Sequence, residues 1–163
     1  MIMVQPMSDD HPPNMRTAEE DFRWAKVALR QYKDEDAAPF KTVSRQVLFS
    51  DAKLAGELRY FEVAPDGYST LERHDHMHAV MILRGAGKVL VGDKVHDVKT
   101  HDLITIPSWA WHQFRPAPGE KLGFLCLVNA DRDRPQLPSA EELTALRDEP
   151  EVARFLDGEE RAS

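Results

Sequence analysis

Histidine is concentrated in one stretch of the chain, where its spacing suits metal binding. The run Glu72-Arg73-His74-Asp75-His76-Met77-His78 places three histidines at alternate positions, beginning two residues after a glutamate. Successive side chains of a β-strand point to opposite faces, so these four would share one face. Neutral imidazole and carboxylate groups are ligands for Zn, Mn, Fe(II), Ni and Cu. A transition-metal site is therefore the first hypothesis.

Distance limits which members of this run can bind one ion. A strand rises about 3.3 Å per residue, so Glu72 and His78 would lie roughly 20 Å apart on a straight strand. Either only an adjacent pair binds the ion, or the chain turns within residues 75–77 and brings His78 back. A distant ligand must complete the shell in both cases, and His112 is the best placed candidate. The alternative is that the histidines are incidental and form a solvated polar edge.

The composition bounds the class of protein. A chain of 163 residues is long enough for one domain with a buried core. Its formal net charge of −7 argues against nucleic acid as the partner, and no apolar run approaches the length of a membrane span. The single cysteine, Cys126, cannot form an internal disulfide, which is typical of a reducing compartment. We expect a cytoplasmic protein with a small-molecule ligand or substrate.

Short strands separated by turn residues must position these side chains. We expect them at 42–49, 56–64, 68–74, 78–84, 88–92, 94–99, 103–106, 111–115 and 121–129. No helical pattern interrupts them, which favours an antiparallel sandwich or barrel.

Helices are expected only outside this β region. A capping box at 17–20 predicts an N-terminal helix, although 25–32 could also run as an edge strand. A second capping box from Ser139 to Glu142, followed by Pro150, predicts short helices within 139–157 that cover an edge or mouth of the barrel. Residues 1–16 are expected to be a disordered tail before a single domain of 17–163.

Two runs, from Gly67 to Gly85 and from His101 to His112, resemble the two motifs of the cupin superfamily. The first motif has a His-x-His pair, then a glutamate, then a glycine seven residues further on. Counting back from Gly85 puts His78 at the glutamate position. The two histidine positions then fall on Glu72 and His74, so one acid and one histidine have exchanged places.

The second motif ends in Pro-x-Gly-x-x-His. Here Pro107 and His112 match, Trp109 stands at the glycine, and His101 stands at the glycine that usually precedes Asp102.

The resemblance covers about 43–129 and implies an all-β fold, the double-stranded β-helix or jelly-roll barrel. It also implies a divalent metal held by Glu72, His74, His78 and His112. With Fe such a site would suit a dioxygenase; with Zn, Mn or Ni it would suit an isomerase or lyase. The alternative is a non-catalytic cupin that binds or senses a small metabolite.

Several residues near this set have two readings. Glu72 could orient an imidazole instead of binding the ion. His76 would lie in the turn, at the pocket rim or behind the ligands, and could act in catalysis. Tyr60 and Glu62 share a strand face and could reach the cavity as acid or base. Cys126 is interpreted as a small core residue rather than a nucleophile.

Apolar side chains outside the site also have two readings. Trp109, Trp111 and Phe114 could wall a ligand pocket or pack in the core. Met81 and Leu83 would lie opposite His78 on an outer face that either the N-terminal segment or a second subunit would cover, and we expect a homodimer.

Overall fold

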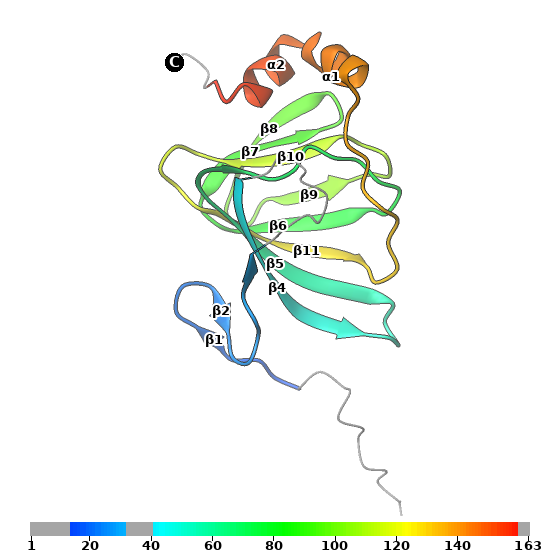
Figure 1. Ribbon diagram of the computed structural model, residues 1–163. Helices are drawn as coiled ribbons and strands as arrows, with labels where there is room; N and C mark the ends of the chain where they lie inside the picture. Colours follow the sequence, from blue (N-terminus) through cyan, green and yellow to red (C-terminus); the bar gives the residue numbers. More distant parts are fainter. Residues whose placement is uncertain (1–13, 32–40, 160–163) are drawn as a thin grey trace, which may run out of the picture.

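The computed structural model describes residues 14–31 and 41–159, which form two facing β-sheets with two helices at one end (Figure 1). The larger sheet contains, in order of pairing, β3 (Arg30–Gln31), β4 (Lys41–Asp51), β5 (Gly56–Tyr68), β11 (Leu122–Asn129), β6 (His78–Arg84) and β9 (Leu103–Ile106). The smaller sheet contains β10 (His112–Pro116), β7 (Ala86–Val91) and β8 (Lys94–Lys99). All these strand pairs are antiparallel, and the predicted all-β, jelly-roll class is confirmed.

Side-chain alternation places one face of each sheet in a shared core. On β6, Val80 and Ile82 are buried whereas Ala79 and Met81 are exposed, as strand geometry requires. The core joins both sheets and consists of Val43, Val63, Val80, Ile82, Val89, Val98, Ile104, Ile106, Phe114, Leu122, Phe124, Cys126 and Val128. His78, at the start of β6, belongs to the same inward-facing series.

The predicted N-terminal helix is wrong. The described part of that segment contains the hairpin β1 (Ala18–Glu19) and β2 (Arg23–Trp24), and β3 then pairs with the edge of β4. Asp21, Phe22 and Lys26 have positive φ angles, which no α-helix allows. The rings of Phe22 and Trp24 lie 5.8 and 5.2 Å from that of Tyr60, so contacts with β5 override the local capping signal.

The C-terminal helices are confirmed. Helix α1 (Ala140–Arg147) begins at the capping box of Ser139 and Glu142, and α2 (Pro150–Leu156) begins with its proline. Val152 and Phe155 of α2 pack on Leu90 of β7. The helices therefore cover the outer face of the smaller sheet rather than the barrel mouth (Figure 1).

The predicted strand at 68–74 is largely wrong. β5 runs on through Tyr68, and the chain then leaves the sheet, with isolated bridges from Glu72 to His112 and from Arg73 to Gln136. The predicted tail, apart from residues 14–16, lies outside the described residues, and the division into tail and single domain stays a prediction. In the described ranges no helix is long and apolar enough to cross a membrane.

The two glycine positions of the second motif keep a glycine-like backbone. His101 has φ of 76° and Trp109 has φ of 62°, both in the left-handed region. The backbone N–H of Trp109 donates to the carbonyl of His74 at 2.7 Å, so this turn supports the histidine run directly.

Candidate metal centre

Three different elements bring the predicted ligands together. His78 begins β6 and His112 begins β10, while Glu72 pairs with His112 through a two-way backbone bridge. His74 lies in the loop between β5 and β6, which bends at Asp75 and His76. The turn that the distance argument required is therefore present.

The ligand atoms converge on one small volume. The Nε2 atoms of His74 and His78 lie 2.9 Å apart, and Nε2 of His112 lies 3.9 Å from Oε1 of Glu72. The ligand atoms of Glu72, His74 and His112 all lie within 4.8 Å of one another. His74 also belongs to a second such group, with His76 and His78, so the four predicted residues lie close together around His74.

Each of these imidazoles is oriented by a partner at its other nitrogen. Nδ1 of His74 lies 2.8 Å from the carbonyl oxygen of His76, and Nδ1 of His112 lies 3.0 Å from that of Ala110. Nδ1 of His78 lies 2.8 Å from Sγ of Cys126. A carbonyl can only accept, so the Nδ1 atoms of His74 and His112 carry the proton and leave Nε2 free to bind a metal.

Burial keeps these imidazoles neutral. Desolvation, followed by the nearby His112 and His74, lowers the pKa of His78 to about 2. Desolvation also lowers the pKa of His112 to about 4. The pKa of His74 is lowered by burial and then by His76. Neutral imidazole is the form that binds metals, so the site is ready to bind one near neutral pH.

His76 lies beside this set, in a different relation to it. One of its ring nitrogens lies within 4.8 Å of a ring nitrogen of His74 and of His78, but its ring stacks on that of His74 with centroids 3.6 Å apart and planes at 4°. A ring nitrogen's lone pair lies in the ring plane, so two parallel rings cannot both direct theirs at one ion. This geometry favours a position behind the ligands for His76.

Asp133 holds the turn that carries His76. Its carboxylate accepts hydrogen bonds from the backbone N–H groups of Asp75 and His76 and lies 2.6 Å from Nδ1 of His76. The backbone N–H of Asp75 is the main cause that lowers the pKa of Asp133. The carbonyl of His76 in turn orients His74, so Asp133 supports a candidate ligand through the turn.

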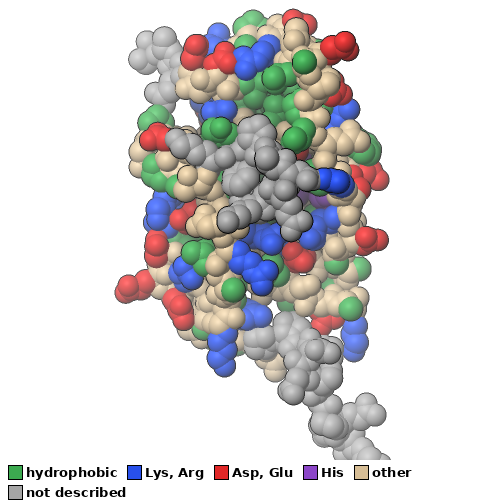
Figure 2. Space-filling view, viewed as in Figure 1, with side chains coloured by type: hydrophobic (Ala, Val, Ile, Leu, Met, Phe, Trp, Pro, Cys, Tyr) green, Lys and Arg blue, Asp and Glu red, His purple; other side chains and the backbone are tan. Residues whose placement is uncertain are grey.

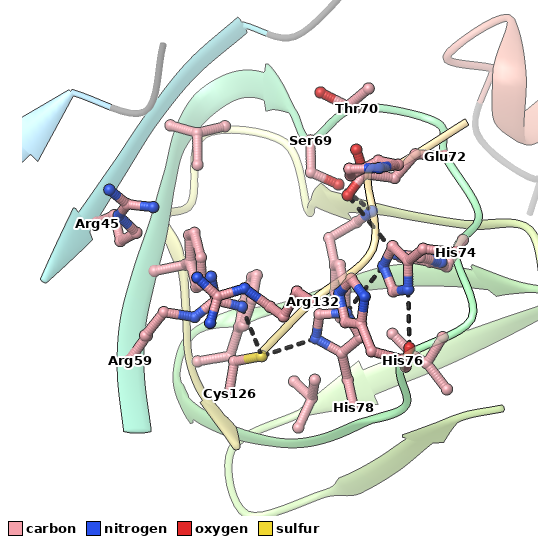
Figure 3. A pocket seen from close by; sticks show the side chains of 18 of the residues that line it. Arg45, Arg59, Ser69, Thr70, Glu72, His74, His76, His78, Cys126 and Arg132 are labelled. Carbon is pink, nitrogen blue, oxygen red and sulfur yellow. Dashed lines mark hydrogen bonds and ion pairs between the residues drawn. The ribbon is translucent and has the colours of Figure 1, made fainter. Parts of the chain in front are cut away.

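The candidate ligands line one side of a cavity of about 200 Å³ between the sheets. That volume is below the usual range of ligand pockets, about 300–1,000 Å³, and suits a small metabolite. The opposite side carries Arg45 of β4 and Arg59 of β5, with Cys126 of β11 between Arg59 and His78 (Figure 3). Arg132 also lines the cavity.

Other candidates from the sequence lie elsewhere. Tyr60 and Glu62 point away from the cavity, on the other face of β5, where the Tyr60 hydroxyl donates to Glu62 and Arg84 pairs with the same carboxylate. Of the three aromatic candidates, Phe114 lines the cavity, while the exposed Trp109 does not.

Trp111 lies under the guanidinium of Arg73, 4.4 Å from it, and likewise does not line the cavity.

For Cys126 the sequence predicted the burial but not the position beside the candidate ligands. It is buried in the core, as expected, but it also lines the cavity and touches His78 and Arg59. Those partners are 48 and 67 residues away in the chain, so no local pattern could indicate them.

Comparison with known proteins identifies the class. The family model of the cupin domain matches residues 59–128. A curated protein of Rhodospirillum rubrum is 56% identical over 151 residues, which cover 93% of this chain and 96% of that protein. The chain belongs to the cupin family.

That relative is named 1-methylthio-D-xylulose 5-phosphate methylsulfurylase. Two crystal structures of cupin-2 domain proteins are also similar. The one from Rhodopseudomonas palustris has a TM-score of 0.82 at 55% identity and covers 86% of this chain and 97% of its own. The one from Rhodospirillum rubrum has a TM-score of 0.81 at 57% identity and covers 88% and 97%.

Proposed function

We propose that this protein is a metal-dependent enzyme that cleaves the carbon–sulfur bond of a phosphorylated methylthio-ketose. The observation that carries the proposal is the cavity, where four metal-ligand side chains face a thiol and guanidinium groups. The substrate class is taken from the name of the 56% identical relative. The sequence left open a dioxygenase and an isomerase or lyase; cleavage of a carbon–sulfur bond is closer to the lyase branch than to dioxygenation.

Glu72, His74, His78 and His112 would hold the ion. Three neutral imidazoles and one carboxylate suit Mn, Fe, Zn or Ni, whereas Ca and Mg prefer oxygen ligands. A divalent ion bound there would polarise the ketone carbonyl next to the carbon that carries sulfur. His74 and His112 are oriented for this role by the carbonyls that hold their Nδ1 protons.

Cys126 is the proposed first acceptor of the methylsulfur group. With Nε2 of His78 committed to an ion, its Nδ1 carries a proton and donates to Sγ, which favours the thiolate. Arg59 lies 3.6 Å from the sulfur, and its positive charge also favours the thiolate. Burial has the opposite effect and raises the pKa of the thiol. These two partners would supply the activation that burial opposes.

The bonds and electrons balance with one external thiol. Sγ of Cys126 attacks the methylthio sulfur, an S–S bond forms, and the C–S bond breaks. Its electron pair stays on the carbon, which then takes a proton to become a methyl ketone. A thiol co-substrate next attacks the Cys126 disulfide, regains the free cysteine and leaves as a methyl disulfide. The carbon is reduced by two electrons and the sulfur pair is oxidised by two.

The test is turnover of 1-methylthio-D-xylulose 5-phosphate with a small thiol, beside elemental analysis of untagged protein. We expect near-stoichiometric transition metal and release of the methylsulfur group. His74→Ala and His112→Ala should lose metal and activity, Cys126→Ala should keep metal and lose activity, and the exposed His96→Ala should keep both. Metal binding without turnover would instead favour a non-catalytic metabolite binder.

A homodimer is proposed from the outer face of the larger sheet. Met81, Leu103 and Leu127, on β6, β9 and β11, have exposed fractions of 38%, 65% and 50%. Met81 and Leu83 do lie opposite His78 on β6, as expected. Light scattering on the parent and on Met81→Glu tests this: a dimer that becomes a monomer supports it, and a monomeric parent contradicts it. A cytoplasmic location also stays a prediction.

A further inference from the structure

We propose that Arg59, assisted by Arg132, binds the phosphate group of the substrate; this inference rests on the proposed function and assigns one part of its site. The guanidinium of Arg59 points into the cavity from the middle of the larger sheet (Figure 3).

Arg59 is a buried cation whose ion pair with Glu57 is too long for a hydrogen bond. Only 6% of its surface is exposed, and among the described residues its Nε has no hydrogen-bond partner. The Oε1 atom of Glu57 lies 3.8 Å from Nε, beyond hydrogen-bonding distance, and Nη2 reaches Cys126 Sγ at 3.6 Å. A guanidinium has five N–H donors, and burying a charge without full compensation destabilises a protein. An anionic ligand would satisfy the remaining donors.

A second guanidinium approaches the same place. Nη1 of Arg132 donates to the carbonyl of Asn129 and lies 3.7 Å from Oε1 of Glu57. Arg45 lines the cavity as well. Arginine forks match the geometry of phosphate oxygens, which they bind in pairs of parallel hydrogen bonds. The chain carries a net charge of −7, yet Lys and Arg side chains gather near the middle of the face in Figure 2.

The spacing suits a phosphorylated five-carbon sugar. Arg59 on β5 and His78 on β6 are separated by one strand, β11. The register pairs Arg59 with Cys126 and Cys126 with Val80, two residues along from His78, which puts the backbones of Arg59 and His78 about 12 Å apart. An extended five-carbon chain with its phosphate spans roughly 7 Å, from bond lengths of about 1.5 Å. A phosphate on Arg59 therefore leaves the carbonyl end of the sugar beside the candidate ligands, with Cys126 between the two ends.

The competing explanation is that Arg59 serves only Cys126. The two roles differ in their dependence on phosphate. If Arg59 only stabilises the thiolate, its loss slows phosphorylated and dephosphorylated substrates equally. If it binds phosphate, its loss weakens binding of inorganic phosphate, and replacing Cys126 does not.

The first experiment measures inorganic phosphate binding to metal-free protein in a chelator, by calorimetry and thermal unfolding. In the parent we expect the unfolding midpoint to rise by about 5–10 °C at a phosphate concentration about 100 times the Kd. Arg59→Met should abolish this shift, because the guanidinium that would hold the phosphate is removed. Cys126→Ala and Arg154→Met, the latter on an exposed position of α2, should keep the shift.

Two outcomes overturn the proposal: no phosphate-dependent shift in the parent, or an unchanged shift in Arg59→Met. Should Arg59→Met fail to fold, Arg59→Lys keeps the charge without the fork, and its Kd for phosphate should rise about tenfold. An unchanged Kd in Arg59→Lys and in Arg132→Gln together would likewise overturn it.

Kinetics separate this proposal from the proposed function. With turnover, Arg59→Met should raise KM for the phosphorylated substrate by roughly 10- to 100-fold more than for its dephosphorylated form. An equal loss for both substrates would overturn the phosphate site and leave the function standing. Absence of turnover in the parent, with phosphate binding that depends on Arg59, would refute the function and leave the site.

Discussion

Lowering the pH of the metal-free protein should destabilise it through the buried candidate ligands. The folded-state pKa values of His78 and His112 are lowered to about 2 and about 4, whereas an unfolded histidine titrates near 6.5. Above about pH 6.5 neither state binds a proton at these residues and stability is unaffected. Below about pH 6.5 the unfolded chain binds protons at these histidines and the folded protein does not, so stability falls as the pH falls.

The expected loss is large relative to the stability of an ordinary domain. Each proton that only the unfolded chain binds costs about 1.4 kcal/mol per pH unit, so the two histidines together cost about 3 kcal/mol per unit while the pH is above the folded pKa of His112. Between about pH 6.5 and 5 the loss is about 4 kcal/mol, against a typical total of about 5–15 kcal/mol. The lowered pKa of His74 adds to the same trend.

Urea unfolding in a chelator at several pH values between about 7 and 5 measures this loss directly. In the double variant His78→Gln, His112→Gln, the free energy of unfolding should depend less on pH than in the parent. His96→Gln, at an exposed position on β8, should leave it as in the parent. A stability that is constant from pH 7 to 5, or a steep dependence that survives in the double variant, would refute the reasoning from burial.

Two further predictions concern the loops around the site. Asp133→Ala removes the carboxylate that fixes the turn of His76. Metal affinity, measured by competitive chelator titration, should therefore fall by roughly 10- to 100-fold. The control variant Asp131→Ala should bind metal as the parent does. His101→Gly should stabilise the protein by roughly 0.5–1 kcal/mol in urea unfolding, because φ of 76° strains any residue with a Cβ. Destabilisation by His101→Gly would show that its side chain matters more than its backbone.

The candidate ligands could be found from the sequence because their signal is local. Glu72, His74 and His78 stand within seven residues, and the family register supplies His112. Glu72 and His78 would be too far apart on a straight strand to share an ion, so a turn was expected between His74 and His78, and the loop bends there. For Glu72, His74 and His78, spacing along the chain was sufficient because these residues follow one another into the same cavity.

The rest of the site could not be predicted because its contacts join distant parts of the chain. Arg59 and Cys126 meet across 67 residues, and Asp133 reaches His76 across 57. The N-terminal capping box failed for the same reason: packing on Tyr60 determines that segment's conformation, and a capping signal contributes only about 1 kcal/mol.

The exchange of acid and histidine relative to the family motif has a chemical consequence that a double variant tests. A glutamate at the position of His78 would put a carboxylate beside Sγ of Cys126, where it would oppose the thiolate and offer no N–H. In Glu72→His with His78→Glu, the ligand set is still three histidines and one glutamate, so metal content should be kept. Transfer of the methylsulfur group should fall by at least about 100-fold, because the donor to Cys126 is gone.

The double variant with Cys126→Ala should be no slower than Cys126→Ala alone, since both changes disable the same sulfur. A double variant that keeps metal and full activity would show that the exchanged positions are equivalent and that His78 acts only as a ligand.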